Sequence, residues 1–199
     1  MRYADGPGVH DEVHIGAAPA EVWRLVADIG LPARISTELQ RVEWLDGATG
    51  PALGAAFEGH NRHPMAGEWR TVSHIVALEP ERLFGWAVTD PDNRFGGGPA
   101  DPAFPLATWQ FELLPEDGGT LLRQSVRVGP APSGLSVAIS RMPDREEQIL
   151  AMRLGELREG IRATLEGVKR LAEEPALDGG ADAAAGAGSG SASGSGSGA

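Results

Sequence analysis

Residues 144–173 of this 199-residue chain read DREEQILAMRLGELREGIRATLEGVKRLAE, and the architecture can be built outward from them. Their apolar residues recur every three or four positions, as they do along one face of an α-helix. These are Leu150, Leu154, Leu157, Ile161, Leu165, Val168 and Leu171. Asp144 can cap the helix, with Glu147 three residues on. A long amphipathic helix is predicted, and its apolar stripe needs a second layer to pack on.

The sequence before this helix predicts that second layer to be a β-sheet. One strand, Val9–Gly16, precedes two short helices, the first beginning at Pro19 and the second lying within Leu31–Leu39. Six further strand-like segments follow, separated by clusters of Pro and Gly. They are Gln40–Leu45, Ala55–Arg62, Glu68–Leu78, Arg82–Thr89, Leu106–Leu114 and Thr120–Val128. The order predicts an α+β fold, with a curved seven-stranded antiparallel sheet wrapped around the long C-terminal helix.

Charge pairing sets the expected register of two hairpins. Placing Arg62 opposite Glu68, and Glu112 opposite Arg123, brings opposite charges face to face on the outer surface. A slip by one residue would mix Trp69 with those charges. The chosen register turns the tryptophans of the strands toward the helix, together with Phe57 and Phe111.

Four polar side chains share that predominantly apolar inner face: Asn61, Thr71, Ser73 and Gln124. A buried polar group without a partner costs about 1–3 kcal/mol, so each needs one. They either bond to one another, to the backbone or to buried water, or they orient a ligand in a cavity. On the second reading the candidate ligand-binding residues are Trp44, Phe57, Asn61, Trp69, Thr71, Ser73, Trp86, Trp109, Phe111 and Gln124.

Two segments contain no periodic pattern. Asp90–Pro105, DPDNRFGGGPADPAFP, is long and rich in Gly and Pro, which is typical of a functional or mobile loop. Phe95 and Phe104 lie within it, and we expect them to cover the opening of the cavity as a gate. Gly129–Pro143 is expected to be a second irregular stretch.

Composition narrows the class of protein. The net charge is −11 and no basic stripe is present, which argues against binding to nucleic acid. Cysteine is absent, which excludes disulfides and thiolate catalysis. No apolar run is long enough to span a membrane, so a cytoplasmic location is the expectation. All the basic residues except Lys169 are Arg, a bias typical of GC-rich bacterial genomes.

The chain is expected to hold one folded domain. Residues 1–8 are predicted to be a flexible N-terminus, residues 9–173 the domain, and residues 174–199 a disordered tail rich in Gly, Ala and Ser. The His60-x-x-His63 pair is not expected to bind a metal, because positions three apart on a strand point to opposite sides.

A set of short motifs resembles the SRPBCC (START-like) superfamily, in particular its polyketide cyclase/dehydrase branch. The motifs are Pro19-Ala20-Glu21-Val22-Trp23, the segment Gly54–Arg62, Trp69, the segment Leu78–Phe84, Ala107-Thr108-Trp109, and Asp117-Gly118-Gly119-Thr120. The resemblance covers about residues 9–172. It implies a helix-grip fold around a hydrophobic cavity that binds lipids, polyketides or isoprenoids. Many members carry an acidic residue where this chain has Gln124.

We therefore expect the protein to bind a small hydrophobic molecule, without metal or cofactor, as a monomer or homodimer. A first alternative is a polyketide cyclase or dehydratase that works by positioning its substrate, with Asn61, Ser73 and Gln124 orienting a carbonyl group. A second alternative is a protein-interaction module whose cavity is filled. The ligand and the pathway are not encoded in any motif of this sequence.

Overall fold

The structure is a computed structural model that describes residues 1–64 and 67–174. The predicted disordered tail lies outside the described residues, apart from Glu174. Seven strands form one antiparallel sheet in the order β1-β7-β6-β5-β4-β3-β2. Their bounds are β1 Gly8–Ile15, β2 Leu39–Trp44, β3 Ala56–His63, β4 Gly67–Glu79, β5 Leu83–Thr89, β6 Ala107–Glu116 and β7 Gly119–Val128. The predicted fold class is confirmed.

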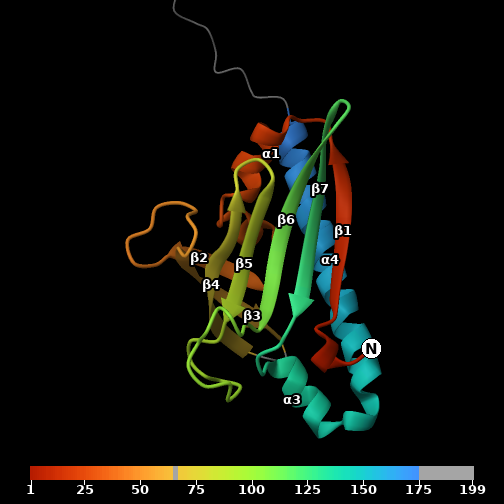
Figure 1. Cartoon of the computed structure of the whole chain (residues 1–199). Coiled ribbons are helices and arrows are strands. Elements are labelled where there is room, and N and C mark those ends of the chain that lie inside the picture. Colours follow the sequence, from red (N-terminus) through yellow and green to blue (C-terminus); the bar gives the residue numbers. More distant parts are fainter. Residues whose placement is uncertain (65–66, 175–199) are drawn as a thin grey trace, which may run out of the picture.

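The helices lie together on one face of this sheet. The two short helices after the first strand are α1, Pro19–Val26, and α2, Leu31–Ile35. The long helix α4, Glu146–Glu173, has 28 residues and lies within the stretch 144–173 that the sequence predicted to be helical. Figure 1 shows α4 running behind β6, β7 and β1, so the view in that figure is onto the outer face of the sheet. The opposite face, toward α4, is called the concave face below.

Two predictions for the segment before α4 are wrong. Gly129–Pro143 is not wholly irregular, because Gly134–Arg141 forms a helix, α3, whose N-cap is Ser133. The Ser133 hydroxyl accepts a hydrogen bond from the backbone N–H of Ser136, the usual way a serine begins a helix. Asp144 does not cap α4. It lies instead in a short 3-10 turn, Pro143–Arg145, that leads directly into the helix.

The N-terminal residues are better anchored than the expectation of a flexible segment implies. Tyr3–Asp5 forms one turn of 3-10 helix, and β1 already begins at Gly8. The Tyr3 hydroxyl donates to the carbonyl oxygen of Ala131 at 2.6 Å. The Tyr3 backbone N–H donates to the Glu146 carboxylate at 2.8 Å. These long-range partners could not be read from the polar, Gly-containing sequence around Tyr3.

The registers predicted from charge are confirmed. Arg62 pairs with Glu68, and Glu112 pairs with Arg123. The outer face carries most of the ion pairs of the sheet. For example, Arg123 bonds both Glu12 of β1 and Glu112 of β6, at 2.8 and 3.4 Å. Because charged residues occupy the outer positions of neighbouring strands, the alternating positions place apolar side chains on the concave face.

The apolar stripe of α4 forms the centre of the core. Ile161 and Val168 are fully buried, and Leu165 is almost so. Within the sheet α4 packs on β1 and β7, and it also contacts α1, α2 and α3. Gly167 allows α2 to come close, because a Cβ at that position would lie 2.5 Å from the Ile35 Cδ1 atom. The helix therefore covers one side of the concave face, over β1 and β7.

We expect Ile161→Ala to lower the free energy of unfolding by about 2–5 kcal/mol, since it removes buried methyl groups and leaves a cavity. Leu171→Ala is the matched control on the same helix, where the side chain is 40 % exposed. Its cost should be below about 1 kcal/mol. Urea denaturation followed by circular dichroism measures both. Equal losses would show that α4 does not pack as described.

Candidate functional site on the concave face

A continuous row of aromatic rings lines the concave face. Trp86 of β5 is its centre, and its ring contacts four others, with centroid distances between 5.4 and 6.5 Å. These are the rings of Phe57, Phe84, Trp109 and Phe111. Trp44 extends the row beyond Phe57, and Trp23 of α1 meets Phe84 edge-on. The sequence analysis placed Trp44, Phe57, Trp86, Trp109 and Phe111 on the inner face, but it did not identify Trp23 as a member.

The two central indoles are stacked and are not fully buried. Trp86 and Trp109 lie opposite each other in the β5–β6 register, with planes 6° apart. Both side chains stay partly exposed, whereas Phe111 beside them is buried. Since α4 makes its sheet contacts on β1 and β7, it leaves this part of the wall incompletely covered. The result is an aromatic surface on the concave face whose two central indoles stay partly exposed.

The polar groups at the far end of the wall are partly satisfied by one another. Asn61 donates its amide hydrogens to the Gly59 carbonyl at 3.3 Å and to the Thr71 hydroxyl at 3.4 Å. Asn61 lies directly opposite Trp69, and Thr71 opposite Gly59, as the predicted register requires. Ser73 is buried opposite Phe57. For Asn61 and Thr71 the structure supports the reading in which the polar groups bond locally.

Gln124 differs from the other three. Its side chain is only 4 % exposed, and its carbonyl oxygen Oε1 is buried without a hydrogen-bond partner among the described residues. It lies between Phe111 of β6 and Asp11 of β1 in the sheet register. A buried acceptor without a partner has lost its hydrogen bonds to water and gained none in the protein, which costs about 1–3 kcal/mol of stability. Gln124 is therefore the residue among these four whose buried oxygen has no hydrogen-bond partner in the described part of the chain.

Asp11 is the charged neighbour of Gln124, and its carboxylate is bound by arginine side chains of α4. Its carboxylate accepts from Arg162 at 2.7 Å and lies 3.5 Å from Arg158. The hydrogen bond from Arg162 lowers the pKa of Asp11, with a smaller contribution from the Glu12 backbone N–H. Asp11 is thus an ionised partner of the helix rather than a free acid or base. The parity of Val9, Val13 and Ile15 places Asp11 inward, and the sequence reading overlooked this signal.

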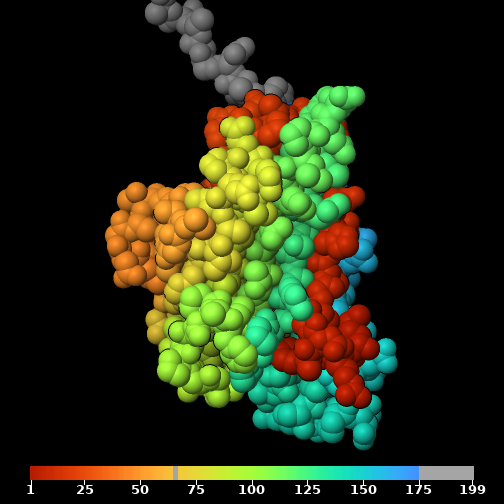
Figure 2. All heavy atoms as spheres, viewed as in Figure 1, coloured from red at the N-terminus to blue at the C-terminus, as the bar shows by residue number. Residues whose placement is uncertain are grey.

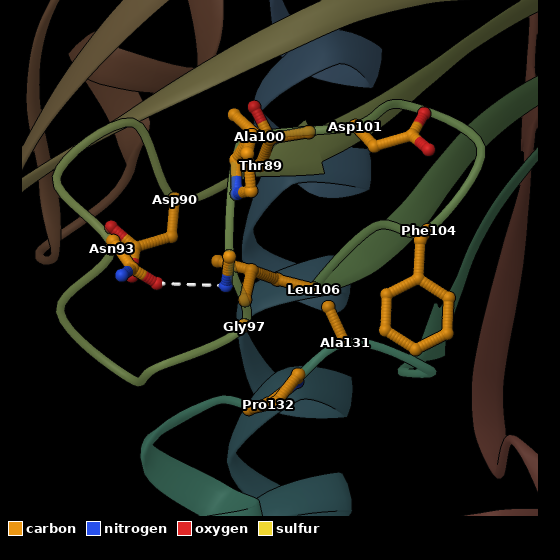
Figure 3. Close-up of a pocket in the computed structure, with 12 residues that line it drawn as sticks. Thr89, Asp90, Asn93, Gly97, Ala100, Asp101, Phe104, Leu106, Ala131 and Pro132 are labelled. Atoms are coloured by element: carbon orange, nitrogen blue, oxygen red, sulfur yellow. Dashed lines mark hydrogen bonds between the residues drawn. The ribbon is translucent and has the colours of Figure 1, made fainter.

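The two hollows that the structure describes lie elsewhere, and none of the ten predicted ligand-binding residues lines either of them. The first has a volume of about 30 Å³ and lies under the loop between β5 and β6 (Figure 3). That volume is too small for an organic ligand. The second, of about 340 Å³, lies beside the N-terminal turn. The ten predicted residues belong to the concave face, and they line neither of these two hollows.

The two predicted gate residues occupy different parts of the loop. Phe95 lies against Gly134 at the start of α3, and Arg94 lies over the rings of both Phe95 and Trp69, at 5.6 and 5.9 Å. Phe104 is 48 % exposed and borders the small hollow near Ala131 (Figure 3). Phe95 is therefore connected through Arg94 to Trp69, one of the predicted ligand-binding residues.

The loop is held by hydrogen bonds rather than being free of contacts. Asp90 accepts from the backbone N–H groups of Asp92 and Phe95, and Asn93 accepts from that of Gly98 (Figure 3). Asp92 is bound by Arg70 of β4 at 2.6 Å, and this hydrogen bond lowers the pKa of Asp92. These contacts fix the start of the loop against the outer face of the sheet.

Comparison with known proteins identifies one matching family and several solved structures of similar fold. The family model described as "Polyketide cyclase / dehydrase and lipid transport" matches residues 7–173. The search of curated proteins found no match. The described residues contain no helix that is long and apolar enough to cross a membrane.

Among solved structures, the solution structure of the Polyketide_cyc-like protein Cgl2372 from Corynebacterium glutamicum is 30 % identical, with a TM-score of 0.54. That match covers 82 % of this chain and 90 % of the other. The di-domain ARO/CYC protein BexL of the BE-7585A biosynthetic pathway is 19 % identical, with a TM-score of 0.61, over 85 % of this chain and 50 % of BexL. Ara h 8.0201 is 14 % identical, with a TM-score of 0.51, over 81 % and 97 %. The last two likenesses concern the fold alone.

The contrast between Gln124 and Asn61 can be tested by stability alone. Gln124→Met keeps the shape and removes the unpaired acceptor, so the free energy of unfolding should stay the same or rise. Asn61→Leu removes an amide that has two partners, and should lower it by about 1 kcal/mol. Urea denaturation compares the two variants with the parent protein. A larger loss for Gln124→Met than for Asn61→Leu would mean that Oε1 is already satisfied.

Proposed function

The chain belongs to the polyketide cyclase/dehydrase and lipid transport family, and we propose that it binds a small hydrophobic molecule on its concave face. The ligand is of the polyketide, lipid or isoprenoid class, and it lies between the sheet and α4. The ten residues from Trp44 to Gln124 that were identified from the sequence form its binding surface. Family membership alone suggests binding without naming a ligand.

The observation that supports this proposal best is the buried Oε1 atom of Gln124, for which the described residues provide no hydrogen-bond partner. Folding normally leaves few such groups, since each lowers stability. Asp11, the charged residue beside it, is held by Arg162 and Arg158. A ligand hydroxyl or N–H that reaches Oε1 would supply the hydrogen bond that this atom lacks within the described part of the structure. Small-molecule sites commonly combine an apolar wall with a few such polar groups.

The aromatic wall suggests what the rest of the ligand looks like. The stacked, partly exposed Trp86 and Trp109 present flat apolar surfaces, against which a planar ring system gains both burial and ring stacking. Ser73, opposite Phe57, lies further along the same face. A flat, mainly apolar molecule with at least one hydroxyl group matches this pattern.

Catalysis of cyclisation or dehydration is the second candidate, and it is favoured by the family description, which includes cyclases and dehydrases. Asn61, Ser73 and Gln124 would hold carbonyl groups of a flexible chain so that its reacting atoms meet, and such positioning accelerates reactions substantially. Asp11 is a poor general base, because its ion pairs with α4 hold its pKa low. We therefore place ligand binding first. Loss of water from an added polyketide, detected by mass spectrometry, would favour catalysis.

The binding proposal is tested with 2-naphthol and its methyl ether, 2-methoxynaphthalene, which lacks the donor hydrogen. Quenching of the tryptophan fluorescence reports binding, because Trp86 and Trp109 lie at the centre of the wall. The parent protein should bind 2-naphthol about tenfold more tightly than the ether, equivalent to one hydrogen bond of about 1.4 kcal/mol. Gln124→Met should remove that preference and leave binding of the ether unchanged.

The matched control is Ser125→Ala, one residue along β7 and on the outer face opposite Gln110 and His10. It should bind both compounds as the parent protein does. If neither compound binds, the hydrophobic-ligand proposal fails. If the ether binds as tightly as 2-naphthol, the wall binds ligand but Gln124 does not orient it.

We also propose that Phe95 and Phe104 gate this surface. Phe95→Ala should raise both the association and the dissociation rate severalfold in stopped-flow fluorescence, with little change in affinity, because a gate controls access. Phe104→Ala should act in the same direction but more weakly, since this ring is 48 % exposed. Leu53→Ala, in an exposed position of another loop, is the control and should leave the rates unchanged. Unchanged rates in Phe95→Ala would disprove gating by this residue.

A further inference from the structure

The hollow of about 340 Å³ beside the N-terminal turn lies apart from the concave face. Three segments that are distant in sequence border it: the N-terminal turn with Tyr3, Ala4 and Gly6; the end of the loop before β6; and the outer side of β6 and β7 up to Pro130. In Figure 2, the N-terminal turn is red, the loop yellow-green and the end of β7 teal, and all three lie in the lower half of the outer face. Its volume falls within the range of small-molecule sites.

Arg127 supplies a positive charge to this hollow, and backbone carbonyl groups hold it in place. Its Nε atom donates to the Gly6 carbonyl at 2.9 Å, and Nη2 donates to that of Asp5 at 3.3 Å. The guanidinium lies so close to Gly6 that a Cβ there would be 2.6 Å from Nε. Among the described residues, Arg127 has no carboxylate within ion-pair distance and its Nη1 atom has no hydrogen-bond partner.

Arg127 differs from Arg123, the other arginine on the outer face of β7, in having no carboxylate partner among the described residues. Arg123 lies on the same strand and the same side, four positions earlier, and it is neutralised by Glu12 and Glu112. In a chain with a net charge of −11, a cation whose charge is not matched by a neighbouring acid is available for an external anion.

The rest of the lining complements a carboxylate attached to an apolar body. Thr108 lies directly opposite Arg127 in the β6–β7 register, and its hydroxyl has no hydrogen-bond partner within the described part of the chain. A guanidinium and a hydroxyl side by side are donors for the two oxygens of a carboxylate. Ala103, Pro105 and Pro130 supply apolar walls.

Tyr3 fixes the remaining wall. Burial raises the pKa of its hydroxyl, so the group stays protonated and donates to the Ala131 carbonyl at 2.6 Å. The same hydroxyl lies 3.2 Å from the Ser133 Oγ atom. With its hydroxyl held in this way, the ring forms a constant side of the hollow beside Gly129. The N-terminal turn is thus a built part of the site and not a loose end resting near it.

We propose that this hollow is a second binding site, which takes a small aromatic or aliphatic monocarboxylate with its carboxylate on Arg127 and Thr108. It is separate from the hydrophobic-ligand surface, because residues of β6 and β7 that alternate along the strands face opposite sides. Trp109 and Val126 point to the concave face, while Thr108 and Arg127 point outward.

The test is a titration of the full chain, labelled with ¹⁵N, with benzoate and with its neutral isostere benzamide. Benzoate should shift the amide resonances of Gly6, Thr108, Arg127 and Gly129, and benzamide should bind at least about tenfold more weakly, the scale of a charge-assisted hydrogen bond. Arg127→Met should abolish benzoate binding. Arg123→Met, the matched control, should leave it unchanged.

Thr108→Val is the second variant, because Arg127→Met also removes the contacts that hold the N-terminal turn. The Thr108 side chain makes no hydrogen bond to that turn among the described residues, so Thr108→Val should weaken benzoate binding severalfold while the melting temperature stays the same. The proposal is overturned if benzamide binds as tightly as benzoate, or if Arg123→Met weakens binding as much as Arg127→Met. It is also overturned if the shifts map to the residues around Gln124, which would place benzoate on the concave face.

Discussion

Burial of the α4 stripe against β1 and β7 is the interaction on which the rest of the structure depends. Ile161, Leu165 and Val168 lose nearly all of their exposure there, and burial of each such side chain contributes on the order of 1.5–3 kcal/mol. Because the helix lies over this side of the sheet, it cannot also cover the strands from β3 to β6 equally well. The aromatic wall remains partly exposed as a direct consequence of where α4 packs.

The same packing decides which polar groups remain available. Arg158 and Arg162 project from α4 toward β1 and bind Asp11, so the one carboxylate next to Gln124 belongs to the helix interface. Asp11 is therefore not available to Gln124, whose Oε1 atom has no hydrogen-bond partner among residues 1–64 and 67–174. A stabilising contact at the edge of the sheet thus leaves an acceptor without a partner inside it, and the proposed ligand site depends on both.

Strand alternation lets β6 and β7 contribute to two different surfaces. Inward positions such as Trp109 and Gln124 contribute to the concave face, and outward positions such as Thr108 and Arg127 border the second hollow. Elsewhere on the outer face, arginines form ion pairs with carboxylates of neighbouring strands. Arg123, which pairs with Glu12 and Glu112, is an example. Arg127 departs from that pattern because the N-terminal turn presents carbonyl oxygens to it where β1 and β6 would present acids.

Local patterns in the sequence were sufficient for the architecture. The apolar period of α4, the pairing of Arg62 with Glu68 and of Glu112 with Arg123, and the alternation of the tryptophans determined the elements, the registers and the inward face. The helix α3, the anchoring of Tyr3 on Ala131 and the ion pairs of Asp11 were decided only by the tertiary structure. The contacts of Tyr3 and Asp11 join residues more than a hundred positions apart in the sequence. The short helix α3 depends on the element that packs against it, which is α4. Periodicity and charge pattern report which way a side chain points within its own element, whereas its partner depends on how distant elements pack together.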